Sequence, residues 1–159
     1  AQVVLLDPRA IQLARFADLH LRQNIGTDVA VLNAMMNVII TEELYDKAFV
    51  ETRTEGFDKL KAVVARYSPR VAETISGIPA KDIEEAARLY ARADKAMIIY
   101  AMGITQHTTG VDNVKTLANL AMLTGHVGRP STGVNPLRGQ NNVQGACDMG
   151  GLPNVFSGY

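Results

Sequence analysis

A chain of 159 residues fits one domain of ordinary size, and its 47% hydrophobic and 20% charged residues are enough to build a folded core. Sixteen Lys and Arg residues balance sixteen Asp and Glu residues, which gives no support for nucleic acid or an anionic membrane as a partner. The single cysteine, Cys147, excludes an internal disulfide and cannot by itself form a zinc or iron–sulfur site.

The first residues show two strand patterns with a helical pattern between them. Residues 3–6 are apolar and begin with two β-branched valines, and Asp7-Pro8 ends strand pairing after them, so a short buried strand is predicted. Residues 10–17 have helix-like spacing. Residues 18–22 then alternate so that Leu19 and Leu21 share a face, which predicts a second, shorter strand.

Helices are expected to dominate the middle of the chain. Gly26 breaks the preceding pattern, Thr27 is a fair N-cap, and Asp28 lies in the first turn of a helix whose apolar residues recur as far as Ile40. Three more helices are predicted at residues 45–52, at residues 57–67 with an end at Ser68-Pro69, and at residues 79–90 with Pro79 near the first turn.

A second strong strand is predicted at residues 95–102, and an amphipathic helix follows at residues 111–122. Strands separated by helices pair in parallel and are joined by right-handed crossovers. We therefore expect an α/β fold with an open, mainly parallel sheet of dinucleotide-binding type and flanking helices. Ligands of such sheets bind at the C-terminal ends of the strands.

The last part of the chain is rich in glycine, with eight of the thirteen glycines at or after Gly125. A long irregular segment is either functional or disordered, and the amides of Asn141, Asn142 and Gln144 favour function. We expect residues 1–128 to form the α/β domain. Residues 129–159 are expected to form a Gly-rich active-site segment that leads to a neighbouring domain.

The ends of the chain and its apolar runs indicate what kind of polypeptide it comes from. The chain opens at Ala1 without an initiator methionine and stops at Tyr159, so we expect an internal piece of a longer polypeptide. The longest apolar run, residues 96–102, is too short to cross a bilayer, and the N-terminus has no signal-peptide pattern. A cytoplasmic protein with no membrane span is the expectation.

Three positions could carry chemistry. Asp7 follows a strand and could accept hydrogen bonds from a ribose or a guanine edge, although a simple turn capping the next helix explains it too. Gly103 and Gln106 could face a ligand, but no Gly-x-Gly-x-x-Gly loop is present and a plain strand-end turn is the alternative. Arg138 offers a planar cation suited to a carboxylate, with a surface arginine as the alternative.

The three histidines match no metal-ligand spacing, and each fits a structural role better than a catalytic one. We expect no metal ligand in this chain.

The run from Arg138 to Pro153, together with residues 102–107 and 33–36, resembles the large subunit of formate dehydrogenases that carry bis(molybdopterin guanine dinucleotide). The resemblance covers essentially the whole chain. The Arg-Gly-Gln-Asn-Asn-Val-Gln-Gly segment that begins at Arg138 is specific to that branch of the molybdopterin oxidoreductases.

This resemblance implies oxidation of formate to carbon dioxide at a molybdenum or tungsten centre. It implies that Arg138 lies beside the metal and holds formate, and that Gly139 and Gln140 approach the pterin. The residues that the resemblance implies around one guanine dinucleotide arm are Asp7, Arg9, Gly26, Asp28, Met102, Gly103 and Gln106.

The family's cysteine cluster for a [4Fe-4S] centre, its Cys or selenocysteine metal ligand and its C-terminal lobe have no match in this sequence. The chain alone is therefore expected to be inactive. Its expected partners are formate, the remaining domains of the subunit, and electron-transfer subunits or another acceptor. The rival hypotheses are another oxidoreductase of the superfamily, such as a nitrate reductase, and a non-catalytic nucleotide-binding module.

Overall fold

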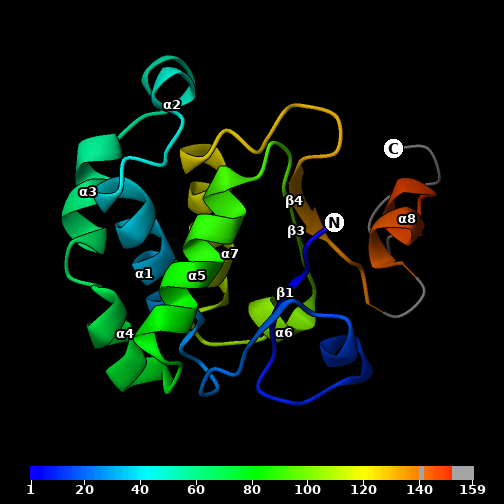
Figure 1. Ribbon diagram of the computed structural model, residues 1–159. Helices are drawn as coiled ribbons and strands as arrows, with labels where there is room; N and C mark the ends of the chain where they lie inside the picture. Colours follow the sequence, from blue (N-terminus) through cyan, green and yellow to red (C-terminus); the bar gives the residue numbers. More distant parts are fainter. Residues whose placement is uncertain (140–141, 152–159) are drawn as a thin grey trace.

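Two pairs of short parallel strands lie beside a group of helices in the computed structural model, which describes residues 1–139 and 142–151 (Figure 1). The strands are β1 (Val4–Leu6), β2 (Leu19–Leu21), β3 (Met97–Tyr100) and β4 (Gly133–Pro136). The helices are the 3₁₀ helix η1 (Gln12–Arg15) and α1 (Asp28–Thr41), α2 (Lys47–Arg53), α3 (Phe57–Val64), α4 (Pro69–Ser76), α5 (Ala80–Arg92), α6 (Met102–Thr105), α7 (Gly110–Leu123) and α8 (Val143–Asp148).

Both strand pairs are parallel. β1 pairs with β2 so that Val4 lies opposite Leu19, and β3 pairs with β4 so that Met97 lies opposite Gly133. The expected α/β class and parallel pairing are confirmed. Instead of one open sheet, the described strands form two separate two-stranded sheets. These strands are only three or four residues long, below the usual length of five or six, so each contributes few ladder hydrogen bonds.

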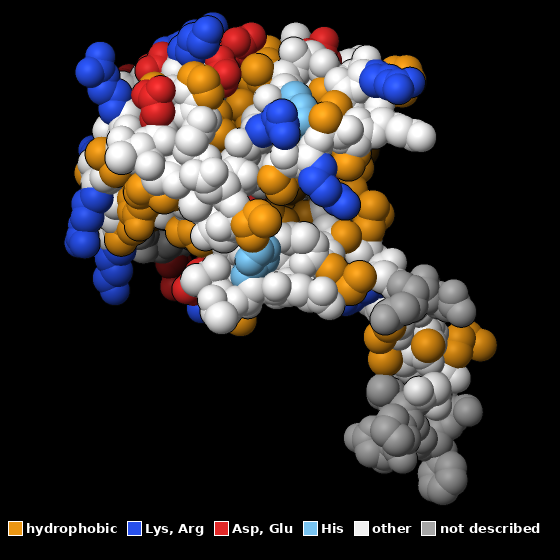
Figure 2. Space-filling view, turned by 90° about the horizontal axis from the view of Figure 1, so that it is seen from below, with side chains coloured by type: hydrophobic (Ala, Val, Ile, Leu, Met, Phe, Trp, Pro, Cys, Tyr) orange, Lys and Arg blue, Asp and Glu red, His pale blue; other side chains and the backbone are white. Residues whose placement is uncertain are grey.

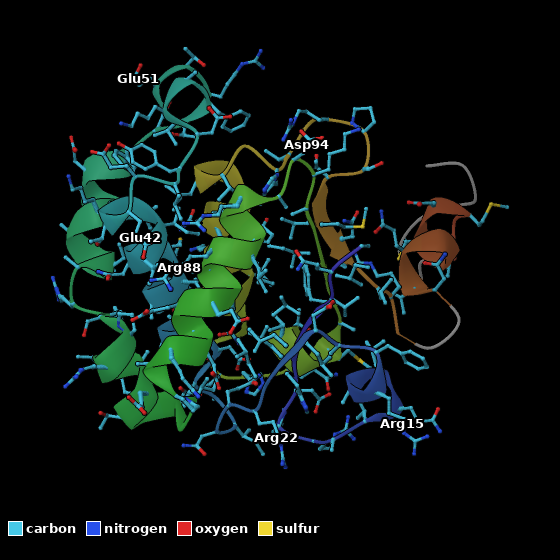
Figure 3. All side chains as sticks on the ribbon, viewed as in Figure 1. Arg15, Arg22, Glu42, Glu51, Arg88 and Asp94 are labelled. Carbon is cyan, nitrogen blue, oxygen red and sulfur yellow. The ribbon has the colours of Figure 1, made fainter. Side chains whose placement is uncertain are left out.

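Helix α1 is the centre of the hydrophobic core. It packs against α3, α4, α5 and α7, and ten of its fourteen residues are buried. A helix that is apolar on most of its faces is stable only when other elements surround it. On its outer side Arg88 of α5 donates a hydrogen bond of 2.6 Å to Glu42, just after α1, and Figure 3 shows the two side chains meeting. The fully buried core side chains include Leu21, Val31, Met36, Ile39, Ile78, Ile83, Leu120 and Leu123.

The predicted helices are confirmed, with shifts of a few residues at their ends. The prediction that Ser68-Pro69 ends the helix at residues 57–67 was wrong, because α3 already ends at Val64, and Ser68 and Pro69 instead begin α4, which was not predicted. The Ser68 hydroxyl accepts from the backbone N–H of Val71 at 3.3 Å. Proline suits this position because its missing N–H would have no partner in the first turn.

The predicted strand at residues 95–102 is shorter and less buried than expected. Met102 begins α6 instead of ending the strand. Ile98 and Tyr100 pack against the core, whereas Met97 and Ile99 on the other face are exposed. β1 is also only partly buried.

The segment after residue 128 holds two elements that the sequence did not predict. β4 pairs with β3, and α8 is capped by Asn142, whose side chain accepts from the backbone N–H of Gly145 at 3.1 Å. Figures 1 and 2 show α8 standing away from the helical body. The expected division of the chain at residue 129 stays a prediction. Across the described ranges, no helix is both long and apolar enough to cross a membrane.

Candidate functional site

The C-terminal ends of three strands lie at one end of the molecule, the lower end in Figure 1. Asp7 follows β1, the 22–27 loop follows β2, and α6 follows β3. Figure 2 looks onto this end and shows basic side chains both within the face and along its edge, two patches of histidine among hydrophobic side chains, and acidic side chains mainly near the edge. A cationic surface at the C-terminal ends of parallel strands is where an anionic ligand is expected to bind in an α/β protein.

Asp7 organises the turn after β1. Its backbone N–H donates to the carbonyl of Leu21 at 3.2 Å, and its carboxylate accepts from the backbone N–H of Arg9 at 2.8 Å. The His20 ring binds the Asp7 carbonyl at 2.8 Å. Asp7 therefore forms a turn at the strand end, as one alternative held, but it does not cap the next helix, because the N-cap of η1 is Ile11 and no side chain caps it.

Two guanidinium groups lie close to this turn. Arg9 is 79% exposed in its side chain and reaches Asp7 only weakly, with Nε 3.5 Å from the carboxylate. Arg22 donates from Nε to the carbonyl of Pro8 at 3.1 Å, and Figure 3 shows it at the lower end of the molecule. Arg22 was not predicted as a site residue from the sequence, although its position directly after a strand could have indicated one. Exposed cations at this position can bind phosphate groups.

Asp28 and Gln23 form a buried polar pair at the start of α1. Asp28 is 4% exposed and Gln23 is 7% exposed, and the amide Nε2 of Gln23 donates to Asp28 Oδ1 at 3.1 Å. The other amide atom, Gln23 Oε1, is buried without a hydrogen-bond partner among the described residues. A carboxylate in the first turn is stabilised by the helix dipole.

The loop beside this pair leaves space for a ligand. Gly26 has a φ of +83°, which favours glycine, and a Cβ built on it would meet nothing within 4 Å. The hydroxyl of Thr27 donates to the carbonyl of Asn24 at 2.7 Å and so holds the loop. The carboxylate of Asp28 can therefore accept hydrogen bonds from a ligand that presents N–H donors.

The structure brings α6 together with the residues after β4. The backbone N–H of Leu137 donates to the carbonyl of Tyr100 at 2.7 Å, which extends the β3–β4 pairing. A Cβ added to Gly139 would lie 3.0 Å from the terminal methyl of Met102, so the backbone at Gly139 approaches Met102 closely. Two predicted site segments, distant in sequence, are thus neighbours in space.

Side chains on α6 and after it are mostly bound to α6 itself. Gln106 donates from its amide to the sulfur of Met102 at 3.2 Å, and His107 contacts the carbonyl of Gly103 at 2.8 Å. Met102, Gly103 and Gln106 are all exposed, so a ligand can reach them.

Arg138 leaves the end of β4 and is exposed. Its Nε and Nη2 atoms donate to Oε1 of Gln144 at 3.1 and 2.9 Å. Gln144 lies on α8 and was not predicted to contact Arg138, because that contact depends on a helix the sequence did not predict. No hydrogen bond between described residues joins Arg138 to Asp7 or Asp28. Gln140 lies outside the described residues.

A buried histidine holds the loop that leads to β4. His126 is 2% exposed, its Nε2 contacts the carbonyl of Tyr90 at 3.1 Å, and Arg129 lies 3.5 Å from its Nδ1. Burial lowers the pKa of His126 and raises the pKa of Tyr90 to about 12. These contacts are structural. Within residues 1–139 and 142–151, no group of three or more His, Cys, Asp and Glu side chains could hold a metal ion.

Comparison with protein families decides the class of protein. The model of the molybdopterin oxidoreductase family matches residues 1–158. The chain belongs to the molybdopterin oxidoreductase family. Membership implies a molybdopterin cofactor, and the ends of the parallel strands described above are the surface that can hold part of it.

Several curated molybdopterin oxidoreductases are closely similar to this chain. The F420-dependent formate dehydrogenase subunit alpha of Methanocaldococcus jannaschii is 56% identical over 159 residues, which is 100% of this chain and 24% of that protein. Formate dehydrogenase H of Escherichia coli is 54% identical over 159 residues, which is 100% of this chain and 22% of that protein. The chain thus spans about a quarter of the length of these relatives.

A solved structure confirms the fold. The acetylene hydratase from Pelobacter acetylenicus matches with a TM-score of 0.79 and 33% identity, covering 82% of this chain and 18% of the hydratase. Its title names a hydratase, so likeness of fold within the molybdopterin oxidoreductases does not by itself identify the reaction.

Proposed function

We propose that this chain is part of the catalytic subunit of a formate dehydrogenase, which oxidises formate to carbon dioxide. The observation that carries the proposal is the identity of 54–56% with formate dehydrogenases over the whole chain, against 33% with the acetylene hydratase. The segment after Arg138 belongs to the matched region and carries the residues expected to face the substrate.

The cofactor we propose is bis(molybdopterin guanine dinucleotide) with molybdenum or tungsten. When bound, it supplies the acceptor for the two electrons that leave formate. The carboxylate of Asp28, which accepts from Gln23 and lies two residues after the open Gly26, fits the N–H groups of a guanine base. Arg9 and Arg22 offer cations for the phosphates of the dinucleotide. The residues present therefore fit one guanine dinucleotide arm.

The segments around Gly139 have a different proposed role. The main chain at Gly139 lies against the side chain of Met102, and without a Cβ at this position a flat ring system can contact the Gly139 backbone. We assign Gly139 and Gln140 to the pterin, and Met102, Gly103 and Gln106 to the dinucleotide arm. The [4Fe-4S] ligands and the metal ligand of the proposed enzyme come from outside this sequence.

Arg138 is the proposed substrate-facing residue. Oε1 of Gln144 accepts from Nε and Nη2 on one side, which leaves Nη1 and the second N–H of Nη2 as a fork for a carboxylate. The cation neutralises formate as it binds and keeps its C–H bond oriented. The favourable charge interaction ends when neutral carbon dioxide forms, which helps product release.

The proposed partners are the remaining domains of the same subunit and electron-transfer subunits or another acceptor. Met97 and Ile99 leave apolar side chains exposed on one face of β3, and we propose that the rest of the subunit covers them. We propose that residues 129–159 lead to the neighbouring domain.

The test compares Arg138→Ala with Arg138→Lys in the intact enzyme. Lysine keeps the charge but not the planar fork, so the pair separates charge from geometry. We expect Arg138→Ala to lower kcat/KM for formate at least about tenfold, since a lost charged hydrogen bond costs about 1.5–3 kcal/mol. Arg138→Lys should be intermediate, and metal and pterin contents should stay unchanged. Full activity of Arg138→Ala with normal cofactor content would overturn the active-site role.

A further inference from the structure

Two buried side-chain polar atoms in the described part of the chain lack a hydrogen-bond partner, the Tyr90 hydroxyl and Oε1 of the Gln23 amide. Gln23 is more than nine-tenths buried, yet only one of the two polar atoms of its amide has a partner. Leaving a buried acceptor without a hydrogen bond costs stability. Turning the amide over would bring Oε1 against Oδ1 of Asp28, two acceptors face to face, so the orientation in which Nε2 donates is the favourable one.

The one hydrogen bond of this amide is made to Asp28. Asp28 is the first residue of the 14-residue helix α1, and among the described hydrogen bonds its carboxylate accepts only that of Gln23, on Oδ1. Oδ2 therefore keeps its accepting capacity for a ligand. The bond to Gln23 fixes the plane of the carboxylate, because rotation about its last side-chain torsion would break it.

We propose that Gln23 is a positioning residue that orients the Asp28 carboxylate toward the adjacent N–H donors of a guanine base, an inference that rests on the nucleotide site proposed above. The unpartnered oxygen is the cost of this arrangement. Guanine offers neighbouring N1–H and 2-amino donors to one carboxylate, hypoxanthine offers only N1–H, and adenine presents an acceptor at N1. A fixed carboxylate therefore selects among these three bases.

The test measures binding of GDP, IDP and ADP to the chain by calorimetry. The chain is suited to it because α1 is surrounded by a core formed within residues 1–139. Gln23→Met keeps the length of the side chain and removes the donor, Asp28→Asn removes the carboxylate, and Gln2→Met is the matched control at an exposed glutamine. Thermal unfolding of each variant reports on the fold.

We expect Gln23→Met to lower the affinity for GDP at least about fivefold, since one hydrogen bond fixes the carboxylate. The loss for IDP should be smaller, because hypoxanthine uses only one donor. The Tm should stay the same or rise, because the apolar side chain removes the unpartnered oxygen. Gln2→Met should leave all three affinities unchanged.

The opposing outcomes separate the two proposals. If Gln23→Met kept the preference for GDP over IDP and ADP while Asp28→Asn lost it, the role of Gln23 would be refuted and the nucleotide site would stand. Equal losses for all three nucleotides with a lower Tm would show that Gln23 is merely structural. If Asp28→Asn kept the preference too, or the unsubstituted chain bound no GDP, the nucleotide site itself would be refuted.

Discussion

The two ends of the proposed site are built in different ways. Asp28 and Gln23 are buried at the start of the most enclosed helix, so the core fixes their positions. Arg138 is exposed and is held by one glutamine on α8, a helix that stands away from the body (Figure 1). Groups fixed by a core keep their geometry at little cost, whereas groups held by local contacts need a further partner to fix them.

This difference assigns different requirements to the two functions. The proposed recognition of a nucleotide depends on residues that this chain orders by itself. The proposed orientation of formate depends on Arg138, which would need the rest of the subunit around it. We therefore expect the chain alone to keep the first proposed function without the second.

The largest expected effect is on the free energy of unfolding, and it is tested with one substitution in the core and one in the exposed segment after α8. Leu21 is fully buried in β2, and its carbonyl accepts from the N–H of Asp7, so Leu21→Ala should lower the free energy of unfolding by about 2–5 kcal/mol. Met149, just after α8, is 80% exposed, and Met149→Ala should change the free energy of unfolding by less than about 0.5 kcal/mol. Urea denaturation measures both. Similar losses in the two variants would show that the α8 segment is packed after all.

The same contrast explains which parts of the fold the sequence predicted. The apolar spacing from Val29 to Ile40 predicted α1 because one local pattern and a buried environment agree. β4 has the sequence Gly-Val-Asn-Pro, which has little preference for a strand, and it exists because β3 pairs with it. A strand that depends on a partner distant in sequence cannot be predicted from its own residues.

The candidate site, too, could be predicted only where its residues do not depend on distant partners. The resemblance placed Met102 and Gly139 near the cofactor, and the structure brings these two residues together. Gln23 was not singled out, because nothing local distinguishes a buried amide with an unpartnered oxygen from an exposed one. Gln144 was noted only for its amide, and its bond to Arg138 requires the turn of α8.

The next effect is on the pH dependence of stability and concerns the loop before β4, in which His126 contacts the carbonyl of Tyr90 in α5. Burial lowers the pKa of His126 in the folded chain, although its hydrogen bond to Tyr90 opposes this, and the Arg129 cation lowers it further. The unfolded chain then binds the proton more readily, so stability is complete above pH about 6.5 and falls as the pH drops below that value. His126→Gln should reduce the loss of unfolding free energy between pH 7.5 and 5.5, by at most about 1.4 kcal/mol, the value of one proton over one pH unit.

Denaturation curves at several pH values check this, and only the slope against pH is compared, since the substitution itself alters packing. An unchanged slope in His126→Gln would mean that this histidine takes up its proton equally in both states. The start of the segment that carries Arg138 would then not be anchored by a neutral imidazole.

The smallest expected effect tests how Arg138 is held. If Gln144 only orients the guanidinium, Gln144→Ala in the intact enzyme should lower kcat/KM for formate about two- to threefold, the worth of one modest hydrogen bond at an exposed site. Gln144→Glu keeps an acceptor at this position but adds a negative charge that competes with formate for Arg138, so its loss should be larger and should appear mainly in KM. Steady-state kinetics at several formate concentrations separates the two variants. A loss in Gln144→Ala as large as that in Arg138→Ala would show that the local contact, and not the surrounding subunit, fixes the arginine, and the contrast between the two ends of the site would fail.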